Sequence, residues 1–300
     1  MQLYESGHRN FKGINLSGAD LSGCILINVD LSGANLTGAN LSRAFLTKGQ
    51  FIGTQFQRAK LTFAKLSESN FSQANLTKVQ GQGAFWIKSN LSHAQLSGAH
   101  LGHVNLRQSC LRHVNLCGAI LTGVNLREAQ LSGTSFAWAN LSGARLYGAD
   151  ITAVQFNGAN LESSRLNGLD FHGCDLSGVN FAHAHMKGTN LQQTNLIAAN
   201  FTHAQLQHAN LQQAQMRGAN LHHTQLQRAN LVGVNLSRVN IEQADLTGAI
   251  LTNTSFPDAK PIAQPTVAGV NAKELVRQSA VQASMSKLYL GLFPSKRQVG

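Results

Sequence analysis

Three histidines recur at every twentieth position, at His183, His203 and His223. Imidazole nitrogens bind Zn²⁺ and related metal ions, so these residues could form a metal site if the fold brings them together. No carboxylate occupies the same register, and Gln243 follows at the next interval. Histidine-rich surfaces more often supply polar, partly titrating side chains. The spacing therefore gives a candidate metal site and, as the alternative, a plain polar surface.

Basic residues follow the same interval at Arg145, Arg165 and His185, and again at Arg107 and Arg127. Like charges that lie side by side repel one another unless an anionic partner compensates them. If the fold stacks these residues, they favour a basic contact surface. The alternative is that the side chains splay into water and bind nothing.

A third set at this interval combines aromatic side chains with a cation, at Phe45, Lys65 and Phe85. Exposed aromatic residues beside a cation are common on surfaces that bind partners. Single exposed aromatic residues also occur on any protein surface. We therefore take these three residues as a possible contact surface, together with Arg145 and Arg165.

A five-residue frame must position all of these side chains. Every fifth residue from Phe11 to Phe256 is large and apolar, at 50 positions in which Gly81 is the single exception. A small residue stands two positions earlier and Asn or Asp most often one position earlier, as in Ala34, Asn35 and Leu36. Five residues cannot bury a core alone, so neighbouring units must share one, as the repeats of a solenoid do.

The units resemble the pentapeptide-repeat family, whose motif is A(D/N)LxX; ANLSG and ANLTG are examples in this chain. The resemblance implies an all-β fold, a right-handed quadrilateral β-helix in which four units form one coil. It implies about 12 coils, with residues four units apart stacked roughly 4.8 Å from one another. The large residue and the small one point inward. The expected core therefore includes Leu16, Leu36, Phe56, Trp86, Leu106, Phe136, Phe156, Phe181, Leu206 and Leu231.

The array divides the chain into four segments. Residues 1–10 are expected to cap its N-terminal end, and residues 11–256 form the β-helix. All four prolines follow residue 256, so 257–270 is expected to be a linker. Residues 271–300 contain a helix-capping pattern and apolar side chains, which predict a helical cap or an interaction tail that could self-associate.

Gly81 leaves one core position empty, and Trp86 is the next large residue along the frame. We expect the Trp86 ring to occupy the volume that Gly81 leaves.

The unbroken frame also bears on function. It contains no insertion that could form a catalytic loop, and no nucleophile–base pair or phosphate loop is recognised, so we expect no enzyme activity and no cofactor. No stretch is long and apolar enough to span a membrane, and the polar N-terminus favours a cytoplasmic protein. These features predict a rigid scaffold that binds a protein partner, whose identity the sequence does not give.

Two alternative functions follow from the family resemblance and from the net charge of the chain. Some family members mimic DNA and bind topoisomerases, which needs an acidic surface, whereas this chain has a net charge of +11. Its array holds 17 Lys and Arg against 10 Asp and Glu. Weak electrostatic binding of a polyanion is therefore the second alternative, but specific nucleic-acid recognition is not expected. The resemblance to cyanobacterial members also implies a regulatory role, such as developmental patterning of filaments.

Overall fold

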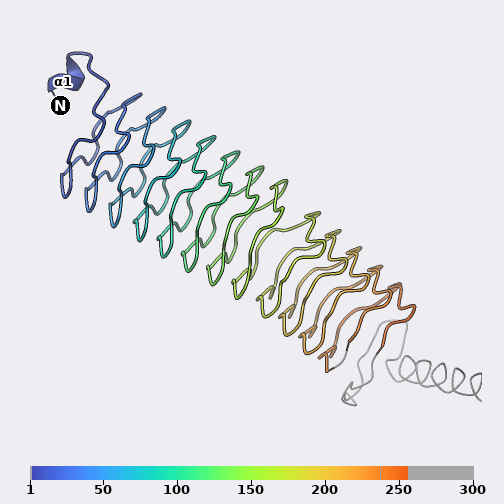
Figure 1. Cartoon of the computed structure of the whole chain (residues 1–300). Coiled ribbons are helices and arrows are strands. Elements are labelled where there is room, and N and C mark those ends of the chain that lie inside the picture. Colours follow the sequence, from blue (N-terminus) through green and yellow to red (C-terminus); the bar gives the residue numbers. More distant parts are fainter. Residues whose placement is uncertain (1, 237, 256–300) are drawn as a thin grey trace, which may run out of the picture.

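The structure, a computed structural model, describes residues 2–236 and 238–255. Phe256, the predicted linker at 257–270 and the predicted helical segment at 271–300 lie outside the described residues. The described chain winds into a long stack of similar coils (Figure 1).

Parallel β-bridges join each coil to the next in a register of four units. Four ladders run along the stack, and they begin with Asn10↔Asp30, Asn15↔Asn35, Asp20↔Asn40 and Ile25↔Phe45. Each unit contributes one bridging residue and then turns, so the described residues contain isolated bridges and no continuous strand or sheet. The expectation of an all-β fold is corrected in this respect, because the corner after each bridge interrupts the extended backbone.

One unit shows why the motif repeats, because all five of its N–H groups have acceptors. Asn35 donates to the preceding coil at 2.9 Å, and Leu36 and Gly38 donate to the following coil at 2.7 and 2.9 Å. Ala39 donates to the Leu36 carbonyl at 3.0 Å and closes the turn. The remaining N–H, of Thr37, donates to Oδ1 of Asn35 at 3.1 Å. Asn or Asp before the large residue therefore satisfies the one amide that finds no backbone acceptor in its own unit or in a neighbouring coil.

The corner residue, two positions after the large residue, has left-handed backbone. Gly38 has a φ of 68°, and His203 in the same position of another unit has a φ of 58°. This conformation explains the frequent glycine, which adopts it without steric cost.

The two inward positions of each unit form one continuous core. Of the ten residues expected there, nine are buried and Leu16, in the first coil, is partly buried. Trp86 lies beside Gly81: a Cβ added to Gly81 would come within 3.4 Å of the Trp86 ring. The indole also packs edge-to-face on Phe71. The Trp86 ring and Leu101, whose Cδ2 would lie 3.0 Å from that added Cβ, together fill the place of the missing side chain.

A short helix precedes the first coil. Helix α1 (Gln2–Glu5) was not foreseen within the predicted cap at 1–10. The Tyr4 hydroxyl donates to the Ile27 carbonyl at 2.9 Å, and the Arg9 guanidinium lies 3.9 Å from the centre of the Tyr4 ring. The Tyr4–Ile27 hydrogen bond fastens the N-terminal segment to the first coil, and the Arg9–Tyr4 contact holds the segment together.

The ladders are interrupted at one level, which forms a seam between the coils that contain Asp150 and Asp170. The bridges that the register requires between Asp150 and Asp170, and between Gln155 and Asp175, are absent in this fully described stretch. The other two ladders continue across the seam. The wider interval is visible in Figure 1 where the ribbon turns from green to yellow.

We attribute the opening to two features of the side chains at the seam. Leu169 occupies the inward position that elsewhere holds a small residue such as Ala34. Overpacking of a close-packed interior pushes the backbone apart. Asp150 and Asp170 also occupy facing positions on the two coils, where like charges repel. The stack is therefore closed on two walls and open on two at this level.

Candidate functional site

The four ladders define four side walls, and cations gather on one of them. This wall, hereafter the basic wall, is formed by the units that begin with Ile25, Phe45, Lys65 and Phe85 and by every fourth unit after them. Of the array's 17 Lys and Arg, nine belong to it: Lys48, Lys65, Lys88, Arg107, Arg127, Arg145, Arg165, Lys187 and Arg228. Its acidic residues are Glu68, Glu128 and Asp245.

The other three walls together are nearly neutral. They share the remaining eight Lys and Arg and seven Asp and Glu of the array. The net charge of +7 on the array therefore comes almost wholly from the basic wall, where cations exceed acids by six. Cations that are spread along the sequence therefore lie together on one wall of the fold.

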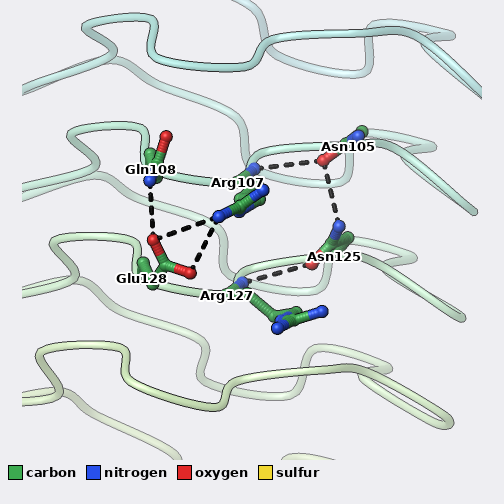
Figure 2. Close-up of polar contacts among 6 residues, drawn as sticks. All are labelled: Asn105, Arg107, Gln108, Asn125, Arg127 and Glu128. Atoms are coloured by element: carbon green, nitrogen blue, oxygen red, sulfur yellow. Dashed lines mark hydrogen bonds and ion pairs between the residues drawn. The ribbon is translucent and has the colours of Figure 1, made fainter.

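The middle of the basic wall holds one neutralised arginine. Nη2 of Arg107 lies 3.1 Å from Oε1 of Glu128, and Nε2 of Gln108 donates to Oε2 of the same carboxylate at 2.6 Å (Figure 2). Both hydrogen bonds lower the pKa of Glu128, and the one from Gln108 has the larger effect. Glu128 is thus ionised and already engaged within the wall.

The backbone that carries Arg107 and Arg127 is held by two asparagines. Oδ1 of Asn105 accepts from the Arg107 N–H at 3.2 Å, and Oδ1 of Asn125 accepts from the Arg127 N–H at 3.3 Å. The Asn125 amide also donates to Oδ1 of Asn105 at 3.1 Å and links the two coils. Figure 2 shows the Arg127 side chain directed away from Glu128. The two arginines therefore project from a fixed base.

Arg145 and Arg165 lie side by side on consecutive coils. They pair through a parallel bridge, and both side chains are exposed. Within the described part of the chain, neither of them forms an ion pair, and neither does Arg127. The structure thus places the two basic sets that the sequence singled out, Arg145 with Arg165 and Arg107 with Arg127, on one wall.

The aromatic part of the predicted surface is altered by its own lysine. The Lys65 ammonium lies 3.6 Å from the centre of the Phe85 ring. Phe45 has an exposed fraction of 44%, whereas Phe85 is only partly exposed. Lys65 and Phe85 therefore satisfy each other by a cation–π contact, and Phe45, Lys65 and Phe85 stay a prediction as a contact surface.

The histidines stack on the wall adjacent to the basic wall. The ring centres of His183 and His203 are 4.9 Å apart, those of His203 and His223 are 4.6 Å apart, and both pairs are tilted by only 10°. Among the described residues, no group of three or more His, Cys, Asp or Glu side chains has an arrangement that could hold a metal ion.

Sequence reasoning missed a fourth member of this stack. The His222 ring lies edge-on to His223 with ring centres 4.2 Å apart, and its Nδ1 is 3.8 Å from Oε2 of Glu242. A comparison confined to positions four units apart cannot find it, since His222 belongs to a neighbouring column. Desolvation, and then the charges of His223 and His183, lower the pKa of His203.

Over residues 2–236 and 238–255, no helix has the length and apolar composition that crossing a bilayer requires.

The chain belongs to the pentapeptide-repeat family. The description "Pentapeptide repeats (8 copies)" matches residues 10–48, 54–80, 82–108, 109–148 and 144–181, and "Pentapeptide repeat region" matches residues 164–241. These matches cover most of the described array, and they confirm the resemblance drawn from the A(D/N)LxX units. No curated protein matches the chain.

Several solved structures are similar to this chain. HetL, a pentapeptide repeat protein involved in heterocyst differentiation regulation from the cyanobacterium Nostoc sp. strain PCC 7120, is 30% identical. The match covers 86% of this chain and 96% of HetL, with a TM-score of 0.36. A pentapeptide repeat protein of the Arabidopsis thaliana thylakoid lumen is 34% identical over 38% of this chain and 70% of its own, with a TM-score of 0.23. QnrB1, a plasmid-mediated fluoroquinolone resistance protein, is 18% identical over 59% of this chain and 91% of its own, with a TM-score of 0.42.

Proposed function

We propose that this protein is a non-enzymatic, rigid scaffold that binds a protein partner along its basic wall, and that the partner supplies carboxylates. The observation that carries the proposal is the group Arg127, Arg145 and Arg165, which form no ion pair among the described residues. Adjacent cations that form no ion pair raise the free energy of the isolated protein, and the Glu128 carboxylate, which Arg127 also stabilises by its charge, is already held by Arg107 and Gln108. An acidic partner removes that cost on binding.

The shape of the molecule supports a scaffold. We take it to be the right-handed stack of about 12 four-sided coils that its family implies. The interior is filled by apolar side chains, and neighbouring coils are tied by backbone hydrogen bonds. An open hollow on the wall adjacent to the basic wall is lined by Ser22, Gly23, Ser42, Arg43, Thr62 and Phe63. It brings together no nucleophile with a general base, which argues against catalysis there.

The charge distribution speaks against DNA mimicry, because a mimic of duplex DNA presents anions and this array presents cations. A polyanion remains the competing ligand for the basic wall. The exposed side chains Ile25, Ile27 and Phe45 at the N-terminal end of the same wall favour a protein, since apolar and aromatic contacts are typical of protein interfaces. A regulatory role, such as developmental patterning in cyanobacteria, stays a prediction, as does a cytoplasmic location.

Capture from extracts of the expressing cells with the immobilised full chain tests the proposal. The variant Arg127→Glu with Arg165→Glu reverses two cations of the basic wall. Its control, Arg217→Glu with Lys60→Glu, makes the same change of charge at the same two positions of the repeat on other walls. Wild type and control should retain a protein that the basic-wall variant loses.

Two results would contradict the proposal. One is a partner that both double variants retain equally. The other is a captured complex that nuclease dissolves, which would identify a nucleic acid as the ligand.

A further inference from the structure

The cations in the middle of the basic wall form a file that is two columns wide: Arg145 and Arg165 stand just before the large residue of their units, and Arg107, Arg127 and Lys187 stand just after it. One stands on each of five consecutive coils: Arg107, Arg127, Arg145, Arg165 and Lys187. The ladder beneath them is continuous even at the seam, where Arg145 and Arg165 are bridge-paired. With coils about 4.8 Å apart, the file has cations at about 0, 4.8, 9.6, 14.4 and 19.2 Å along the axis.

The spacing of this file discriminates between partners. In an α-helix that rises about 1.5 Å per residue, positions i, i+3, i+7, i+10 and i+14 share one face and lie at about 0, 4.5, 10.5, 15 and 21 Å. Each falls within about 2 Å of a cation, which flexible side chains can span. In an extended strand, residues on one face recur every 6.6 Å or so, and the fifth would lie about 26 Å along, far past Lys187.

A nucleic-acid duplex fits the file less well than a helix does. Its phosphates follow a path that winds around the axis, with about one charge per 1.7 Å of axis when both strands are counted. Only a short part of that path can follow a straight, flat wall before it turns away. Four of the five cations are arginines, whose planar guanidinium matches a carboxylate in bidentate geometry.

The same wall offers an anchor beside the cations. Tyr147 follows Arg127 in its column and has an exposed fraction of 61%. Tyrosine and arginine are among the residue types that most often dominate binding energy at protein interfaces. An apolar side chain next to the acidic stripe of a helix would pack on the Tyr147 ring while carboxylates meet Arg127 and Arg145.

From this geometry we infer that the partner docks an α-helix parallel to the axis of the stack, with Asp or Glu at i, i+3, i+7, i+10 and i+14. The inference rests on the proposed function, because it assumes that the basic wall binds a protein. It adds the secondary structure, the direction and the charge pattern of the bound segment. The Arg107–Glu128 pair would open or share its guanidinium when the helix binds.

Two synthetic peptides serve as probes for the full chain. One is a helix with five glutamates in the stripe, and the other has the same composition with its glutamates spread around the helix. The striped peptide should bind about tenfold or more tightly than the scattered one, measured by fluorescence anisotropy at low and moderate salt. Binding should fall about tenfold or more in Arg127→Glu with Arg165→Glu. It should change less than about twofold in Arg217→Glu with Lys60→Glu, with folding checked by circular dichroism.

The outcomes separate the inference from the proposed function. If both peptides bind equally and only the basic-wall variant loses them, the wall binds acidic chains and the helix inference fails alone. If oligothymidine binds more tightly than the striped peptide and depends on the same arginines, the helix inference fails and a polyanion replaces the protein partner. If neither double variant alters peptide binding, the basic wall is not the site and both proposals fail.

Discussion

At the scale of single residues, the stack depends on side chains that complete the hydrogen bonding of the backbone. Asn200 accepts from the Thr202 N–H at 3.1 Å and donates to Asn180 on the preceding coil at 3.0 Å. It thus serves its own corner and the ladder together. Hydrogen bonds of this kind contribute about 1 kcal/mol each, so the array gains stability in small, repeated increments.

Trp86 and Gly81 form a compensating pair, and we predict that they are energetically coupled. Trp86→Leu should lower the free energy of unfolding by about 2–3 kcal/mol, because the smaller side chain leaves a cavity beside Gly81. Adding Gly81→Leu should recover most of that loss, since it restores two ordinary core units. The indole Nε1 has no hydrogen-bond partner in the described part of the chain, so its removal favours the double variant. Urea denaturation measures both changes, and a double variant less stable than Trp86→Leu would contradict the coupling.

His203 makes the stability of the fold sensitive to acid. Its pKa is lowered from an ordinary value of 6.5, so below that pH the unfolded chain binds a proton that the folded chain resists. The free energy of unfolding should therefore fall as the pH drops below about 6.5. His183, His223 and His222 surround His203, and Glu242 lies near His222.

The test compares wild type with His203→Gln. Between roughly pH 7.5 and pH 5.5, the Tm of wild type should fall further than that of the variant, because the variant lacks the proton-resisting group. Carboxylates whose protonation in acid destabilises the fold are present in both proteins, so their effect cancels in the comparison. Equal falls in Tm would show that His203 does not carry the effect.

At the scale of elements, each five-residue unit is a turn with one bridging residue. The ladder hydrogen bonds form between one whole coil and the next. Two ladders that open at one level therefore leave amides without acceptors. Ile151 and Phe156 occupy positions whose N–H groups elsewhere donate to the next coil, as Leu36 does, but here they have no backbone acceptor among the described residues. The seam should be the part of the described stack that exchanges its amide hydrogens most easily.

Removing the causes of the seam should close it. Leu169→Ala with Asp170→Asn restores a small inward residue and removes one of the two facing carboxylates. Hydrogen exchange at Ile151 and Phe156 should then slow about tenfold or more, because new ladder bonds protect them. Leu206→Ala, at an ordinary core position, should destabilise the protein by about 2–5 kcal/mol without slowing exchange at the seam. Unchanged exchange in the double variant would contradict this explanation.

At the scale of the whole molecule, the regular frame turns sequence spacing into surface position. Stacking of residues four units apart followed from the family resemblance that the repeat carries, and so did the burial of residues such as Leu36 and Phe156. Helix α1, the Lys65–Phe85 contact and His222 did not, because they depend on side-chain rotamers, chain ends or neighbouring columns. The seam was also missed, although Leu169 at a small-residue position was a signal in the sequence. The basic wall could have been predicted by summing the charge of every fourth unit along the chain.

The central claim is that the protein partner binds on the basic wall, and arginine-directed chemical footprinting tests it most directly. Phenylglyoxal modification of the full chain, with and without the captured partner, would be read by mass spectrometry at each arginine. We predict that the partner protects Arg127, Arg145 and Arg165 and leaves Arg58 and Arg217, on the opposite wall, as reactive as before. Protection of Arg58 and Arg217, or equal protection on both walls, would contradict the account.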